Sequence, residues 1–123
     1  MNNRDVLSDS IVVVSGARTP IGGYMGGLSS TPTYRLGSLA VQAAIWRAGV
    51  DPEDVDEVIM GCIGQVGPEA YNARRVLIDA GIPLSAAAYN VNRLCGSGLQ
   101  AILSGAMQPQ LGQSNVVVAG GNE

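Results

Sequence analysis

Short apolar runs rich in β-branched residues alternate along this chain with longer stretches of helical periodicity, and this alternation constrains the fold most. Four runs are predicted to be strands: residues 11–15, 58–61, 88–91 and 116–119. Helical stretches separate them, so right-handed βαβ crossovers and a mixed or mostly parallel sheet are expected. The sequence therefore predicts an α/β fold.

The predicted helices have recognisable starts and stops. One helix begins near Thr33 and ends at Gly49, and residues 51–53 have the N-cap, proline and acidic pattern of a short helix start. A further helix is predicted over 72–80, and the last one over 98–111.

Two segments interrupt this pattern. Residues 16–27 are rich in glycine and contain a proline, which predicts a long loop without the spacing of a phosphate-binding loop. Pro109 lies inside the last predicted helix, where its ring would crowd the carbonyl of Gly105. We expect a bend there, or a helix that ends early.

Charged residues are scarce. They make up only 14% of the chain, against about 25% in typical globular proteins. A small domain has more surface per residue and needs more polar cover, not less. We therefore expect protein outside this sequence to cover some faces of the domain.

The residue content excludes several functions. With a net charge of −3, the chain lacks the basic face of a nucleic-acid-binding protein. It contains no His, which excludes a Ser-His or Cys-His dyad within the chain and any His-based metal site, and its two cysteines lack metal-ligand spacing. No metal is expected.

The beginning of the chain resembles no targeting segment. Residues 1–10 lack the apolar stretch of a signal peptide, and no apolar run is long enough to span a membrane. We expect an N-terminal extension over 1–10, a single domain over 11–123, and a cytoplasmic location.

The most informative segment is 92–101, where a predicted strand leads through a turn into a helix. Cys95 lies at that turn. The partial positive charge of a helix N-terminus favours thiolate over thiol, and unpaired backbone N–H groups there can receive an oxyanion. Gly96 and Gly98, on either side of Ser97, leave room for a substrate carbonyl. The pattern alone leaves open a catalytic nucleophile or an inert buried cysteine.

The sequence Asn92-Arg93-Leu94-Cys95-Gly96-Ser97-Gly98-Leu99-Gln100-Ala101 is similar to the nucleophile signature of the thiolases. Residues 14–22 resemble the first strand of that family and the loop after it. Further segments follow in the order of the family: residues 48–50, 55–61, 72–74 and 116–123. The resemblance covers nearly everything from residue 11 onward.

The resemblance implies a thiolase-like βαβαβαβ half-domain with a mixed sheet, incomplete at the C-terminus. Cys95 would accept an acyl group from acyl-CoA for Claisen condensation or for thiolysis of a 3-ketoacyl-CoA. Its backbone N–H would contribute to the oxyanion hole, and Gly96, Ser97 and Gly98 would support the turn. Coenzyme A thioesters are the implied substrates, and no cofactor is expected.

The family places its catalytic histidines, a second acid/base cysteine, the asparagine of its Asn-Glu-Ala-Phe motif and most of its CoA-binding loop domain after this region. The chain alone is therefore expected to be inactive. The implied partners are acyl-CoA or CoA, and either further copies of the chain or a complementary C-terminal thiolase chain.

Other candidate residues are interpreted as structural. Cys62 lies outside any acid/base motif of the family and is predicted to be a buried structural thiol. Arg18 and Arg74 are expected to form ion pairs or subunit contacts rather than to bind CoA phosphates, so the CoA-binding residues remain unknown. Tyr24 and Met25 are expected to pack within their loop.

Two alternatives remain open. A β-ketoacyl synthase-like condensing enzyme would share the superfamily but take an acyl-carrier-protein substrate, and a Cys-x-Gly motif further along the chain distinguishes the two. A non-catalytic half-domain that assembles into an oligomer is the alternative from another class. A separate chain bearing the histidines would favour the enzyme.

Overall fold

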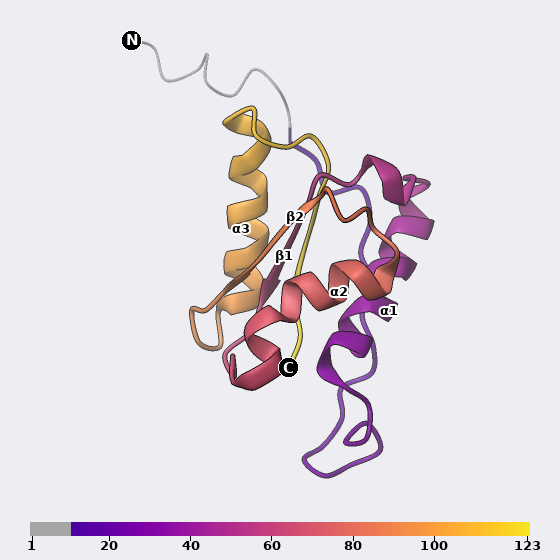
Figure 1. Cartoon of the computed structure of the whole chain (residues 1–123), viewed down its shortest axis with the longest axis vertical. Coiled ribbons are helices and arrows are strands. Elements are labelled where there is room, and N and C mark those ends of the chain that lie inside the picture. The colour runs from indigo at the N-terminus through magenta and orange to yellow at the C-terminus, as the bar shows by residue number, and fades with distance from the viewer. Residues whose placement is uncertain (1–10) are drawn as a thin grey trace.

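A computed structural model describes residues 11–123, and the N-terminal extension predicted for residues 1–10 lies outside the described residues. A sheet lies between α3 on one face and the helices α1 and α2 on the other (Figure 1). The elements, in chain order, are α1 (Thr33–Ala48), η2 (Pro52–Asp54), β1 (Glu57–Gly61), η3 (Gly67–Tyr71), α2 (Asn72–Ala80), β2 (Ala87–Val91), α3 (Ser97–Gln110) and β3 (Val117–Gly121).

Within residues 11–123 the sheet has three strands in the order β2-β1-β3, and both pairings are parallel. In register, Glu57 of β1 lies opposite Ala87 of β2 and Val117 of β3. A helix follows β1 and another follows β2, and such crossovers bring successive strands back in the same direction. The predicted α/β class is confirmed, but the strands that form are all parallel rather than mixed.

The strand predicted for residues 11–15 is wrong, because this segment is not paired as a strand within the described chain. β-branched composition favours a strand only in a suitable context. The outer edge of β3 is free within residues 11–123, but a cavity is lined by that strand and by residues 11–23, and the segment runs beside α1, where the Arg47 guanidinium donates a hydrogen bond to the Gly16 carbonyl at 3.0 Å. Val13 is left 83% exposed.

The predicted helix boundaries are largely confirmed. α1 ends at Gly49, which adopts φ 66°, and α2 ends at Gly81 with φ 83°, so both caps use the left-handed conformation that glycine tolerates best. The short helix η2 is capped by the Asp51 side chain, as its sequence predicts. Pro109 lies in the last turn of α3, which ends one residue later, so the proline accompanies the end of the helix.

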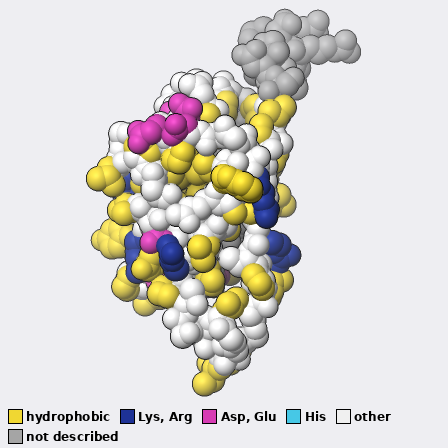
Figure 2. Space-filling model, turned by 90° about the vertical axis from the view of Figure 1, so that its right-hand side faces the viewer, with side chains coloured by type: hydrophobic (Ala, Val, Ile, Leu, Met, Phe, Trp, Pro, Cys, Tyr) yellow, Lys and Arg dark blue, Asp and Glu magenta, His cyan; other side chains and the backbone are white. Residues whose placement is uncertain are grey.

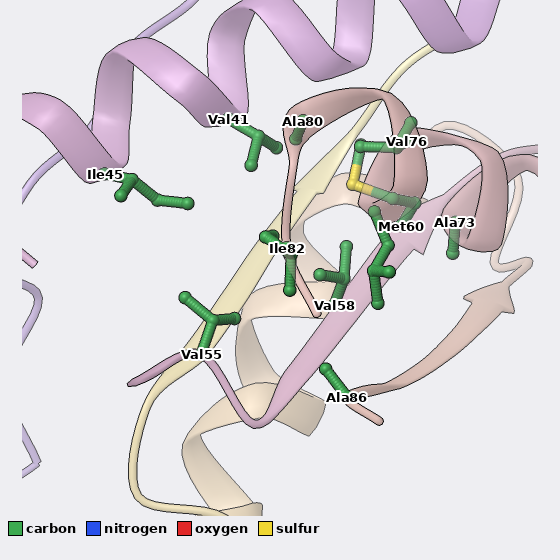
Figure 3. Close-up of a cluster of buried hydrophobic side chains, with 11 residues drawn as sticks. Val41, Ile45, Val55, Val58, Met60, Ala73, Val76, Ala80, Ile82 and Ala86 are labelled. Carbon is green, nitrogen blue, oxygen red and sulfur yellow. The ribbon is translucent and has the colours of Figure 1, made fainter. Parts of the chain in front are cut away.

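The main core lies between the sheet, α2 and α1 (Figure 3). Val58 and Met60 of β1 meet Val76 and Leu77 of α2, and Val41 of α1 packs against the same cluster. β1 is buried along its whole length because helices cover both of its faces.

α3 presents small residues to the opposite face of the sheet. A Cβ atom at Gly105 would lie 3.1 Å from Val117 and 3.3 Å from Ala119, so the helix axis lies close to β3. The outer face of α3 is apolar and open to solvent, with Leu99 64% and Leu103 49% exposed. That additional protein covers this face stays a prediction.

A second open region lies along the free edge of β3. A cavity of about 1540 Å³ is lined there by β3, α1, α3 and residues 11–23. The face seen from the side of α1 carries hydrophobic side chains over much of its surface (Figure 2). Tyr24 is 98% and Met25 80% exposed, so the expectation that they pack within their loop is wrong.

We predict that the isolated chain self-associates. Leaving apolar area exposed costs about 25 cal/mol per Å², so a patch of several hundred Å² costs several kcal/mol. The double substitution of Leu99→Gln and Leu103→Gln should shift the chain toward monomer in sedimentation velocity, whereas Leu84→Gln, which removes an exposed leucine away from α3, should not. This prediction would be contradicted if the wild-type chain sedimented as a compact monomer even as its concentration was raised.

Candidate functional site

The turn between β2 and α3 places Cys95 beyond the carboxyl ends of the strands. The connection after β1 leads to β2 on one side of it, and the connection after β2 crosses back to β3 on the other side, so the strand order reverses between β1 and β3. In open α/β sheets, ligands bind beyond the carboxyl ends of strands at such a switch point. The position of the turn alone therefore favours a ligand site.

Hydrogen bonds hold the turn in one conformation. The Ser97 hydroxyl accepts from the Arg93 N–H at 2.8 Å and donates to the Leu94 carbonyl at 2.5 Å. Leu94 adopts φ 49°, a conformation uncommon for a residue other than glycine, and its N–H donates to Oδ1 of Asn92 at 3.0 Å. Such backbone strain persists only where neighbours enforce it, and it clusters at functional sites.

Cys95 is exposed on this turn. The N–H groups of Gly96 and Ser97 donate to carbonyls within the turn, at 3.1 and 2.9 Å. By contrast, the N–H groups of Cys95 and Gly98 form no hydrogen bond to any residue in 11–123. The turn therefore offers a thiol together with unpaired donors near the start of a helix, which is the arrangement that an oxyanion requires.

A cavity of about 330 Å³ opens beside the thiol. It brings together three of the predicted site residues, namely Cys95, Ser97 and Gly98, whereas Gly96 does not line it. Leu94 of the same turn lines it as well, and the other lining residues come from the ends of β1 and β3 and the segments that follow them: Gly61, Ile63, Gly121, Asn122 and Glu123.

Backbone contacts between glycines seat the start of α3 on the sheet. A Cβ atom at Gly61 would lie 2.6 Å from the Gly98 nitrogen, and one at Gly121 would lie 3.1 Å from the Gly98 Cα. Side chains at Gly61 or Gly121 would therefore push the first turn of α3, and Cys95 with it, away from the strands. Our sequence reasoning missed both residues, although each ends a strand on the same edge of the sheet.

The end of β3 is anchored by an amide pair. Asn122 donates to the Thr33 carbonyl at 2.7 Å and to Oδ1 of Asn72 at 3.1 Å, and its own Oδ1 accepts from Asn72 at 2.7 Å. Asn72 is fully buried. These bonds join β3 to the starts of α1 and α2, so the glycine-lined end of the strand has a fixed position.

Cys62 differs sharply from Cys95. It is only 2% exposed, as predicted for a structural thiol. Burial raises the pKa of the Cys62 thiol, and the negative charges of Glu123 and Glu69 raise it further. A buried thiol with a raised pKa supplies little thiolate near neutral pH.

The remaining candidates take no part in this cavity. Arg74 donates to the backbone carbonyls of Ala86 and Leu84, both at 2.9 Å, rather than forming the expected ion pair. Arg18 is exposed and does not line the cavity beside Cys95. No cluster of three His, Cys, Asp or Glu side chains able to hold a metal ion occurs within residues 11–123.

We predict that iodoacetamide modifies Cys95 much faster than Cys62, because one thiol is exposed and the other is buried with a raised pKa. Peptide mapping after brief labelling at pH 7.5 should find nearly all of the label on Cys95, and labelling of Cys62 should increase as the pH is raised. Equal labelling of the two thiols in the folded chain would contradict the placement of Cys62.

We predict that Gly61→Ala destabilises the chain, because its Cβ atom would overlap the backbone of Ser97 and Gly98. Overpacking of this kind costs about 1–3 kcal/mol. Gly23→Ala is the matched control, since nothing lies within 4 Å of the added atom. Thermal melts followed by circular dichroism compare the two variants, and a Gly61→Ala melt equal to that of wild type would refute the close contact.

Comparison with known proteins agrees with this geometry. The sequence model of the thiolase N-terminal domain matches residues 11–123. The chain is 47% identical to a cytosolic acetyl-CoA acetyltransferase of Gibberella zeae, over 92% of this chain and 28% of that protein. It is 46% identical to acetyl-CoA acetyltransferase 2 of Arabidopsis thaliana, over 100% of this chain and 29% of that protein.

A solved structure is similar as well. The crystal structure of the Bacillus anthracis acetyl-CoA acetyltransferase matches with a TM-score of 0.85 and 45% sequence identity, over 89% of this chain and 28% of that one. The chain thus spans less than a third of the length of these relatives. It belongs to the thiolase family, to whose N-terminal domain residues 11–123 correspond.

Proposed function

We propose that this chain supplies the acyl-accepting part of an acyl-CoA C-acyltransferase, with Cys95 as the nucleophile. One observation carries the proposal. The exposed thiol of Cys95 adjoins a cavity at the switch point of the sheet, and the turn that bears it leaves the N–H groups of Cys95 and Gly98 free within residues 11–123. Relatives named acetyl-CoA acetyltransferase support the same chemistry.

The proposed first step is transthioesterification. The Cys95 thiolate forms a bond to the carbonyl carbon of an acyl-CoA thioester, and the negative charge that develops on the carbonyl oxygen is stabilised by the free N–H groups. The bond from that carbon to the CoA sulfur then breaks, and CoA leaves with the proton that Cys95 had carried. The product is an S-acyl group on Cys95 and free CoA.

In the second step the acyl group leaves Cys95. In the condensing direction it passes to the α-carbon of acetyl-CoA, which must first lose a proton. In the thiolytic direction the Cys95 thiolate instead forms a bond to the 3-keto carbon of a 3-ketoacyl-CoA, and the bond between C2 and C3 breaks. The enolate of acetyl-CoA that leaves takes up a proton, and the shortened acyl group then passes from Cys95 to the sulfur of CoA. Both directions need a general base, and this chain contains no His. We assign the proton transfers to polypeptide outside these 123 residues.

Two exposed surfaces of the chain are suited to contact the polypeptide that would carry the general base. The apolar outer face of α3 and the open edge of β3 are the surfaces where the remaining part of the enzyme, or another copy of the chain, would lie. No helix within residues 11–123 has the length and apolar character needed to cross a membrane. The expected cytoplasmic location remains a prediction, since relatives are named both cytosolic and mitochondrial.

The alternatives differ in what they require of Cys95. A non-catalytic assembly module needs no reactive thiol, and a β-ketoacyl synthase takes its acyl group from a carrier protein rather than from CoA. Acetyl-CoA acetyltransferases among the relatives favour CoA as the acyl donor.

We predict no turnover by the purified chain alone, and thiolase activity once a chain carrying the remaining part of an acetyl-CoA acetyltransferase is added. When catalytic groups act as a unit, the absence of one lowers the reaction rate by nearly as much as the absence of all of them. In the completed enzyme Cys95→Ala should lower the rate at least about a thousandfold, and Cys62→Ala should leave it within a few-fold. Thiolysis of acetoacetyl-CoA, followed by absorbance, measures both variants.

Two outcomes would contradict the proposal. Turnover by the rigorously purified chain alone would show that no outside base is required. A completed enzyme that retains activity after Cys95→Ala would show that another group accepts the acyl chain.

A further inference from the structure

Glu123, which follows β3, joins the end of that strand to the loop that follows β1. Its Oε1 accepts hydrogen bonds from the N–H of Ile63, at 3.1 Å, and from the N–H of Gly64. Successive N–H groups that converge on one oxygen form an anion-binding concavity. Glu123 and Ile63 both line the cavity beside Cys95, so this carboxylate ties two walls of the cavity together.

The contact continues to the turn that bears the thiol. The carbonyl of Ile63 accepts from the Asn92 side-chain amide at 3.3 Å, and Oδ1 of Asn92 accepts from the Leu94 N–H at 3.0 Å. Leu94 is the residue with the left-handed backbone, and it directly precedes Cys95. A continuous chain of hydrogen bonds therefore leads from Glu123 through Ile63 and Asn92 to Leu94.

We propose that Glu123 is a positioning residue for acyl transfer at Cys95. It fixes Ile63 as the apolar wall of the cavity and, through Asn92, holds the turn that carries the thiol. This inference rests on the proposed function. The two N–H groups offset the negative charge of the carboxylate, so that Glu123 can line the cavity without an unpartnered charge facing the substrate.

The hydrogen bonds from the N–H groups of Ile63 and Gly64 to Glu123 form a clamp on this loop. This clamp has a second consequence, which does not depend on acyl transfer. Cys62 lies between two lining residues of the cavity, Gly61 and Ile63, yet is only 2% exposed. By holding the backbone at Ile63 and Gly64, Glu123 keeps the loop closed next to Cys62. The clamp thus leaves Cys95 as the accessible thiol at this cavity.

The test compares Glu123→Ala with Glu123→Gln. Glutamine retains an oxygen that can accept from Ile63 and Gly64 but removes the charge, whereas alanine removes both. Glu53→Ala is the matched control, because Glu53 is exposed and its side chain forms no hydrogen bond within the described chain. Labelling of Cys62 by iodoacetamide reports loop opening, and mass spectrometry of the completed enzyme with acetyl-CoA reports the thioester on Cys95.

Glu123→Ala should raise the labelling rate of Cys62 at least about tenfold, because hydrogen bonds to a charged group are lost. It should also slow thioester formation on Cys95. Glu53→Ala should stay within about threefold of wild type for both readouts, and Glu123→Gln within about threefold for thioester formation. Labelling of Cys62 should rise less in Glu123→Gln than in Glu123→Ala, because the loop stays closed and only the loss of the negative charge, which lowers the pKa of Cys62, acts there. Unchanged labelling and acylation in Glu123→Ala would overturn the proposal. Impairment of Glu123→Gln equal to that of Glu123→Ala would also overturn it, since the neutral acceptor should rescue the clamp.

Hydrogen exchange of the wild-type chain covers the case in which Glu123→Ala does not fold. The Ile63 and Gly64 amides should be protected, and exchange at the rate of an unstructured peptide would overturn the clamp. If wild-type enzyme forms no thioester at all, the proposed function fails. The exchange and Cys62 labelling results still decide separately whether Glu123 closes the loop.

Discussion

The contact between the first turn of α3 and the glycines that end β1 and β3 is the constraint on which the site depends. A side chain at Gly61 would overlap the backbone of Ser97 and Gly98, and a Cβ atom at Gly121 would lie only 3.1 Å from the Gly98 Cα. This approach brings the start of a helix directly over the carboxyl ends of two adjacent strands. It thereby places the thiol of Cys95, a cavity and free backbone N–H groups within one small region. The same contact therefore fixes both the packing of α3 on the sheet and the position of the groups at the candidate site.

Electrostatics at this site depend on backbone rather than on charged side chains. Within residues 11–123 no Arg side chain lines the cavity beside Cys95, and the carboxylate that lines it, that of Glu123, accepts hydrogen bonds from N–H groups of the neighbouring loop. Charge that develops on a thioester oxygen would therefore be stabilised by fixed N–H dipoles, which need no reorganisation during the reaction. Such a site would suit the neutral acyl group of the proposed reaction, and under that proposal the CoA phosphates would be recognised by residues elsewhere.

Local signals in the sequence were sufficient for the α/β class, the helix boundaries and the turn that carries Cys95. Gly49 and Gly81 end their helices through their own backbone conformation, which depends little on the rest of the fold. Residues 11–15 were mispredicted because β-branched composition does not reveal whether the segment pairs with the free edge of β3. Gly61, Gly121 and Glu123 were missed because their importance arises from contacts between residues distant in sequence, and these follow only once β1 and β3 are known to be neighbours.

In the proposed reaction, an acyl group on Cys95 lies in the cavity at the strand ends. Nuclear magnetic resonance of the completed enzyme, treated with acetyl-CoA labelled with carbon-13 in the acetyl group, measures this directly. The account predicts a thioester carbonyl signal on Cys95 and nuclear Overhauser effects from the acetyl methyl to Ile63 and Gly121, which line the cavity. Absence of the thioester, or a methyl group with contacts only to residues outside the cavity, would contradict it.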